Sequence, residues 1–285
     1  MPASLTSVTG IKIVGVPRNG DILGVINLFD EEGKLIGLVS AAEVTAFRTA
    51  LATMTLLVRC NAIKKGKVVV FGAGKQAEWH VRLSLILFGE EVKEVVFVNR
   101  SRGRAGKVVD GIVESLDGGS VSVRSFTKEG SSDEEYGDGL RKLVGEADVV
   151  FCCTPSVEPL FPFEFLGENG QDKRKSRFIS LIGSYKPHMQ EIDTETLLSG
   201  GGKVYVDSKE ACLAESGEII RAKLTEEDLV AIGDVFADGQ EEVVVEEGKN
   251  VVFKCVGLGI MDVAISKALI GIAKERNVGV EVEDF

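Results

Sequence analysis

A turn that contains two glycines constrains this chain more than any other feature. It is the segment Gly72-Ala73-Gly74-Lys75-Gln76-Ala77, between a β-branched apolar run at 67–71 and a helix-like pattern at 76–88. In a strand–turn–helix unit, the first glycine permits the tight turn, the second lets a pyrophosphate approach the backbone, and a small third residue lets the helix pack closely. The helix N-terminus adds N–H groups and a favourable dipole for phosphates. The turn predicts a dinucleotide site, and the alternative is a purely structural turn.

The alternation of strand and helix continues beyond this unit. Further apolar runs predict strands at 94–98, 121–126, 147–153, 178–182 and 204–206, with helices at 106–116 and 140–144. This order predicts an α/β fold with a Rossmann-type, doubly wound parallel sheet. Two polar stretches, 128–139 and 167–177, are predicted to be surface loops.

The two ends of the chain have a different pattern. Short apolar runs separated by turn residues predict a β meander at 11–39, followed by a helix at 41–58 with Ser40 as its cap. A last helix is predicted at 257–273. We expect 1–60 together with 250–285 to form a smaller α/β domain for substrate binding and dimerisation, and 61–249 to form the Rossmann domain.

Composition excludes several classes of function. The 33 Lys and Arg residues against 44 Asp and Glu residues give a net charge of −11, which disfavours binding to nucleic acid or an anionic membrane. Five cysteines without metal-ligand spacing and only two histidines predict no metal site and no disulfide framework. Since no apolar run reaches the ~18 residues of a membrane span, we expect a cytoplasmic protein.

The end of the second Rossmann strand favours NADP(H) over NAD(H). An NAD site usually has an acidic residue there, whereas this chain has Asn99-Arg100-Ser101-Arg102-Gly103-Arg104. Guanidinium groups suit a 2′-phosphate, and the alternative is a solvated basic loop. A second cofactor contact is predicted at Thr154-Pro155-Ser156, which follows the strand at 147–153. The alternative there is an ordinary turn.

Several motifs together resemble the ornithine cyclodeaminase/mu-crystallin family, in the order in which that family has them. The resemblance implies a homodimer that transfers hydride between a nicotinamide and a carbon–nitrogen bond next to a carboxylate. The matching segments are Ile11–Ile13, Val44–Ala50, Gly72–Ala77, Asn99–Ser101, Ile182–Ser184 with Pro187, Glu191–Ile192, Val206–Ser208, Glu215–Glu218, and Val252–Lys254 with Gly257.

The resemblance assigns roles that the residues alone would not. It implies that Lys12 is catalytic and binds the substrate carboxylate, that Arg48 binds this carboxylate or the cofactor, and that Glu215 relays a proton. It also places Lys186 and Cys255 in the substrate pocket. From the sequence alone, the favoured interpretations are a solvated lysine for Lys12, a snorkelling arginine for Arg48, a helix-terminal carboxylate for Glu215 and a core cysteine for Cys255. The implied cofactor contacts are Arg48, Thr49, Gly72, Ala73, Gly74, Lys75, Gln76, Asn99, Arg100, Ser101, Arg104, Thr154, Pro155, Ser156, Ile182 and Gly183.

Two departures from the family pattern refine the expected activity. Tyr185 stands where cyclodeaminases carry a catalytic aspartate, which disfavours ornithine cyclisation. Family members also carry further residues before the strand of Lys12, so we expect a shortened substrate domain here. The predicted function is NADP(H)-dependent reduction of a small cyclic ketimine carboxylate to the imino acid. The alternatives are an ornithine cyclodeaminase or alanine dehydrogenase-like enzyme acting on an amino acid, and a protein that binds NADPH and a small carboxylate without turnover.

Overall fold

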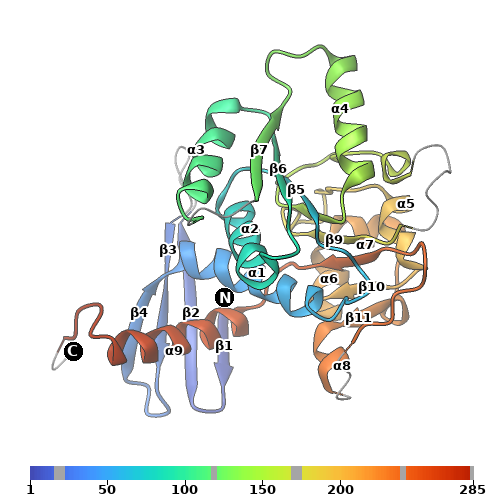
Figure 1. The fold of residues 1–285 in the computed structure, drawn as a ribbon. Coiled ribbons are helices and arrows are strands. Elements are labelled where there is room, and N and C mark those ends of the chain that lie inside the picture. The colour runs from blue at the N-terminus through green and yellow to red at the C-terminus, as the bar shows by residue number, and fades with distance from the viewer. Residues whose placement is uncertain (16–22, 117–120, 168–174, 238–241, 283–285) are drawn as a thin grey trace. The chain divides into compact units, whose positions relative to one another are not determined.

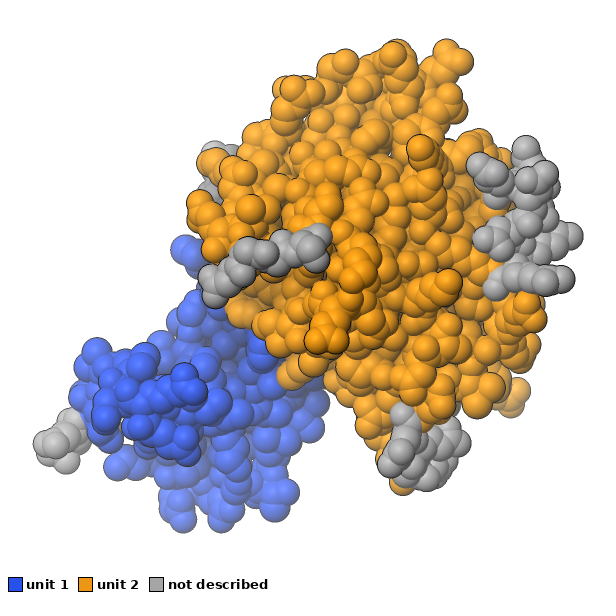
Figure 2. All heavy atoms as spheres, viewed as in Figure 1, with its two compact units in different colours: residues 1–49, 257–285 blue, residues 50–256 orange. Residues whose placement is uncertain are grey.

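The structure, a computed structural model, describes residues 1–15, 23–116, 121–167, 175–237 and 242–282. The chain divides into two compact units, which Figure 2 shows in blue and orange. One unit comprises residues 1–49 and 257–285, and the other comprises residues 50–256. No helix of the described residues is long and apolar enough to cross a bilayer.

The smaller unit is an antiparallel sheet with one helix along its face (Figure 1). Its strands are β1 (Pro2–Leu5), β2 (Val8–Gly15), β3 (Leu23–Phe29) and β4 (Leu35–Ser40), paired in chain order. Alternate residues face α9 (Gly259–Glu275), and the apolar core between them is formed by Val8, Ile26, Leu28, Ala41, Val44 and Val263. The opposite face of this sheet carries Ile13 and Leu38, which are 54% and 61% exposed.

The larger unit contains eight parallel strands in the order β11-β10-β12-β9-β8-β5-β6-β7. Most of these strands are apolar on both faces, as expected for a parallel sheet covered by helices. Their bounds are β5 (Lys67–Phe71), β6 (Glu94–Asn99), β7 (Ser122–Thr127), β8 (Val149–Cys152), β9 (Phe178–Leu181), β10 (Val204–Val206), β11 (Leu229–Ala231) and β12 (Val251–Lys254).

The connections of this sheet create a switch point. β5 pairs with β6 on one side and with β8 on the other, so the direction of strand addition reverses at β5. The helices are α1 (Ala41–Leu57), whose first residues belong to the smaller unit, α2 (Lys75–Phe88), α3 (Arg102–Val113), α4 (Asp133–Glu146), α5 (Thr194–Leu197), α6 (Lys209–Glu215), α7 (Gly217–Ala222) and α8 (Ile232–Ala237). The expected Rossmann-type, doubly wound sheet is confirmed.

Several details differ from the expectations, including the short helices α5 to α8, which were not predicted. The predicted loop at 128–139 contains the start of α4, because Ser132 and Glu135 form a capping box and the acidic residues that follow Ser132 suit a helix N-terminus. β11 and β12 were not predicted. β12 pairs with β9 and β10 in the large sheet, so residues 250–256 lie in the larger unit. Residues 50–60, which include the end of α1, belong to the larger unit as well. Most of the loop predicted at 167–177 lies outside the described residues.

Candidate functional site

The glycine turn joins β5 to α2 with a backbone conformation that requires glycine at Gly72. β5 ends at Phe71 and α2 begins at Lys75, with Gly72 at φ +109°. A side chain at Gly72 would strain the backbone and place its Cβ 2.9 Å from the carbonyl oxygen of Cys153. Gly74 caps α2 without a side-chain hydrogen bond, and no described atom lies within 4 Å of where its Cβ would be. The position of a Cβ at Gly74, beside the N-terminus of α2, is therefore open space.

The loops after β8 and β9 approach each other closely beside this turn. Gly183, which follows β9, lies so near the backbone of Thr154 that no side chain fits at this position. The hydroxyl oxygen of Thr154 would lie 3.2 Å from a Cβ at Gly72. The structure thus brings together the predicted cofactor contacts at Gly72, Thr154 and Gly183. These loops lie at the carboxyl ends of the strands, the edge at which open α/β sheets bind ligands.

A buried carboxylate joins these two loops. Glu191 accepts the N–H of Thr154 at 2.8 Å and the N–H of Gly183 at 2.7 Å. Burial raises the pKa of Glu191 to about 8, against the opposing effects of Lys254 and of the two amides. The resemblance included Glu191, but sequence reasoning gave it no role because its partners lie in other loops.

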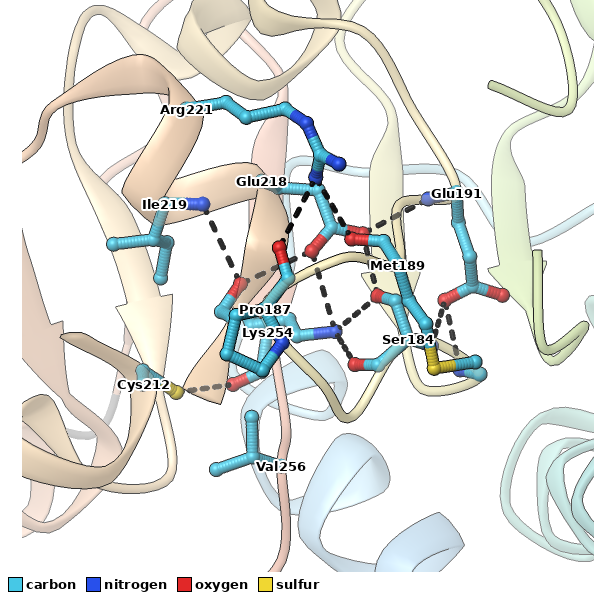
Figure 3. A network of polar contacts seen from close by, with 12 residues as sticks. Ser184, Pro187, Met189, Glu191, Cys212, Glu218, Ile219, Arg221, Lys254 and Val256 are labelled. Carbon is cyan, nitrogen blue, oxygen red and sulfur yellow. Dashed lines mark hydrogen bonds and ion pairs between the residues drawn. The ribbon is translucent and has the colours of Figure 1, made fainter. Parts of the chain in front are cut away.

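Lys254, Glu218 and Ser184 form a network around this carboxylate (Figure 3). The ammonium of Lys254 donates to the hydroxyl of Ser184 at 2.5 Å and to the carbonyl oxygen of Ser184, and lies 3.6 Å from Glu218 Oε2. The Ser184 hydroxyl donates to Glu218 at 2.5 Å. All three side chains are buried, so each charge is offset by a partner rather than by water.

The predicted 2′-phosphate region lies at the end of β6. Arg100 and Arg104 are exposed, and Ser101 caps α3 by accepting the N–H of Arg104 at 3.4 Å. Glu129, which follows β7, accepts the N–H of Arg102 at 2.9 Å. Sequence reasoning missed this acidic residue because it comes from the neighbouring strand. The region therefore combines cations that suit a phosphate with one carboxylate that opposes it.

The smaller unit contains a buried cluster of two cations and one carboxylate. Lys12 Nζ lies 2.6 Å from Asp262 Oδ2, and Arg48 Nε lies 3.1 Å from Asp262 Oδ1. Burial lowers the pKa of Lys12, with a further contribution from Arg48, while Asp262 raises it. Asp262 was not predicted to be a site residue, although a carboxylate within an apolar helix needs a buried partner. Counted as fully ionised, the two cations and one carboxylate have a formal net charge of +1.

The remaining candidates are dispersed within the larger unit. Glu215 is exposed at the end of α6, and Lys186 is exposed with its ammonium 5.6 Å from the centre of the Tyr185 ring. Cys255 is buried, and its thiol lies 3.3 Å from Asp207 Oδ2. Their predicted roles remain expectations.

Comparison with known proteins agrees with this arrangement. The model of the ornithine cyclodeaminase/mu-crystallin family matches residues 1–277 of the chain. The chain belongs to the ornithine cyclodeaminase/mu-crystallin family. An uncharacterized protein of Saccharomyces cerevisiae is 32% identical to this chain over 302 residues, which cover 95% of the chain and 80% of the yeast protein.

Two further proteins are similar to this family member. A Delta(1)-pyrroline-2-carboxylate reductase of Bacillus cereus is 27% identical over 288 residues, covering 96% of the chain and 80% of the reductase. The structure of an archaeal alanine dehydrogenase dimer with bound NAD superposes with a TM-score of 0.77 and 25% identity, covering 100% of this chain and 83% of that one.

Proposed function

We propose that this protein is an NADP(H)-dependent oxidoreductase that reduces a small cyclic ketimine carboxylate to the corresponding imino acid. The observation that carries the proposal is the phosphate-binding turn at Gly72 in the fold of a family that includes imine reductases. A bound nicotinamide supplies the hydride. The chain itself contributes groups that bind the cofactor phosphates, orient the substrate carboxylate and deliver a proton to nitrogen.

Substrate orientation is assigned to Lys12 and Arg48. Their cluster with Asp262 retains one positive charge after internal pairing, and a carboxylate would complete its neutralisation. Two fixed cations select both the charge and the direction of a planar carboxylate. Glu215 is assigned the role of passing a proton to the imine nitrogen, because its carboxylate is exposed and can exchange protons with water. Lys186 and Cys255 are assigned to the wall of the substrate pocket.

The preference for NADP(H) is proposed from Arg100 and Arg104. Both guanidinium groups are exposed beside the end of β6, where a 2′-phosphate would lie. Titration of the intrinsic fluorescence with NADPH and NADH tests this preference. Tighter binding of NADPH supports it, and equal or tighter binding of NADH refutes it.

Turnover is tested by adding cyclic imino carboxylates such as Δ1-pyrroline-2-carboxylate to the protein with NADPH. Lys12→Ala is expected to lower turnover at least tenfold while NADPH binding stays within twofold. Lys267→Ala, which removes an exposed lysine of the same unit, is the matched control. If none of the imines oxidises NADPH, the protein binds the cofactor without turnover. Ammonia release from ornithine would instead indicate a cyclodeaminase.

A homodimer is proposed from the uncovered face of the β1–β4 sheet. Ile13, Leu23 and Leu38 point away from α9 and are more than half exposed, which is unusual for large apolar residues unless they meet a partner. The archaeal relative is itself a dimer. Light scattering after gel filtration should give twice the chain mass, and Leu38→Glu should give a monomer. A monomeric parent protein would contradict the proposal.

A reducing compartment, the cytoplasm, is proposed from the cysteines. All five cysteines are free thiols and form no disulfide, and four of them are buried.

A further inference from the structure

The loops after β8 and β9 are connected through a side chain instead of a backbone ladder. The last ladder contact is the N–H of Ile182 to the carbonyl oxygen of Cys152, at 2.9 Å. Beyond it, one oxygen of Glu191 accepts the N–H of Thr154, and the other accepts the N–H of Gly183. Both donors are main-chain amides, and a main-chain hydrogen bond from the N–H of Gln190 to the carbonyl oxygen of Ser156, at 2.9 Å, is a further link between the two loops.

This contact requires a carboxylate of this length. Both oxygens of Glu191 act as acceptors, at 2.8 Å from the N–H of Thr154 and 2.7 Å from that of Gly183, and the second also lies 3.2 Å from the N–H of Ser184. A glutamine would direct its own N–H₂ group at one of these amides, because only one of its terminal atoms accepts. An aspartate would be one methylene too short to reach both loops.

The main chain of Glu191 is itself hydrogen-bonded to its neighbours (Figure 3). Its N–H donates to Glu218 Oε1 at 2.9 Å, and its carbonyl oxygen accepts the N–H of Leu160 at 2.7 Å. Glu218 is fixed in turn by Lys254 and by the hydroxyl of Ser184. The Glu191 carboxylate therefore fixes the two loops relative to a buried frame formed by Glu218, Lys254 and Ser184.

The order of the sheet indicates which part of a dinucleotide these loops serve. A doubly wound sheet consists of two mononucleotide-binding halves on either side of the switch point. β5, β6 and β7 form one half, in which the end of the second strand, β6, is where the ribose of the adenosine is expected. The strands β8, β9 and β12 therefore form the half expected to hold the nicotinamide. Thr154 and Gly183 each lie two residues after the end of β8 and β9, respectively.

We propose that Glu191 is a positioning residue for the nicotinamide half of the cofactor, acting through the main chain of Thr154 and Gly183. This inference rests on the proposed function, since it assumes that the chain binds a nicotinamide dinucleotide. Glu191 does not touch the cofactor. It fixes the separation of the two loops between which the nicotinamide ribose and ring are held, while the adenosine half binds independently of it.

Binding of two ligands to Glu191→Gln at about pH 9, where Glu191 of the parent is ionised, tests the proposal. NADPH has both halves, whereas adenosine 2′,5′-bisphosphate has only the adenosine half. We expect the dissociation constant of NADPH to rise about ten- to a hundredfold, since one amide faces a donor instead of an acceptor. The constant for the bisphosphate should stay within twofold. Glu195→Gln is the matched control, because Glu195 is an exposed carboxylate of the same segment, and both constants should be unchanged.

Each other result has a definite meaning. Unchanged NADPH binding in Glu191→Gln refutes the proposal, and so does an equal loss for both ligands, which is what general destabilisation would produce. If Glu191→Gln does not fold, the same comparison is made with Glu191→Asp, for which a selective loss of NADPH binding is expected. A parent protein that binds neither ligand refutes the proposed function itself and this inference with it.

Discussion

Acid is expected to destabilise the larger unit through one buried imidazole, that of His80. The ring lies inside α2, with Nδ1 2.7 Å from the carbonyl oxygen of Gln76 and Nε2 2.9 Å from the hydroxyl of Thr53. A carbonyl oxygen only accepts, so Nδ1 carries the proton of the neutral ring and Nε2 accepts from Thr53. Burial against Phe151 leaves no water to solvate a second proton, and the pKa of His80 falls from 6.5 to about 4.

The sign and size of the effect follow from this pKa. Between pH 6.5 and pH 4 the unfolded chain binds a proton at His80 that the folded chain does not, so the free energy of unfolding decreases as the pH falls. The contribution is complete above pH 6.5 and is lost on acidification. One pKa unit corresponds to about 1.4 kcal/mol, so the full effect is about 3 kcal/mol, of which about 2 kcal/mol is lost between pH 7 and pH 5.

Urea unfolding of the parent and of His80→Asn at pH 7 and pH 5 measures this contribution. Trp79, the only tryptophan, neighbours His80 on α2 and reports the larger unit by fluorescence. The parent alone is ambiguous, because the raised pKa of Glu191 makes folding more favourable as the pH falls below about 8. That term is common to both proteins and cancels in their difference.

The difference in unfolding free energy between parent and His80→Asn should narrow by about 2 kcal/mol from pH 7 to pH 5. His188→Asn, which removes the exposed histidine, should follow the parent at both pH values. A difference that is the same at pH 7 and pH 5 would refute the reasoning.

Three further substitutions have specific expected results. Gly183→Ala should lower the free energy of unfolding by about 3 kcal/mol in urea and abolish NADPH binding, since its Cβ would overlap the backbone of Thr154; a stable variant that binds NADPH would contradict this. Asp262→Asn removes the group that raises the pKa of Lys12, so the KM for an imine carboxylate should begin to rise at a lower pH than in the parent; an identical pH profile would argue against the assigned role of Lys12. Glu129→Gln should increase the ratio of NADPH to NADH affinity severalfold, because a carboxylate beside the 2′-phosphate is removed; an unchanged ratio would place the phosphate elsewhere.

Features of the fold that depend on neighbouring residues could be predicted from the sequence. The strand β5, the glycine turn and α2 are local in sequence, and their periodicity and turn chemistry are sufficient to identify them. The start of α4 was missed because a capping box followed by acidic residues has the composition of a surface loop. β11 and β12, of three and four residues, were missed, although the equally short β10 and β9 were predicted.

Features of the candidate site that depend on distant residues could not be predicted in this way. Asp262 is 214 residues from Arg48 in the chain, and Glu191 is 37 residues from Thr154. Neither carboxylate has a local pattern that names its partner. Glu129 reaches the end of β6 only because β7 pairs with β6.

The two buried ionic clusters are better explained by positioning than by stability. Removing a carboxylate and a lysine from water is costly, and well-packed apolar residues in the same volume are often as stable or more so. Stability alone therefore gives little reason to bury Lys254 with Glu218, or Lys12 with Asp262. What charged groups provide and apolar groups do not is direction. Glu191 and its frame fix main-chain amides at the carboxyl ends of β8 and β9, and Asp262 fixes two cations on the smaller unit. In both places a carboxylate orients groups that a ligand needs. Substitution of Glu191 or Asp262 should therefore reduce the free energy of ligand binding by more than it reduces the free energy of unfolding.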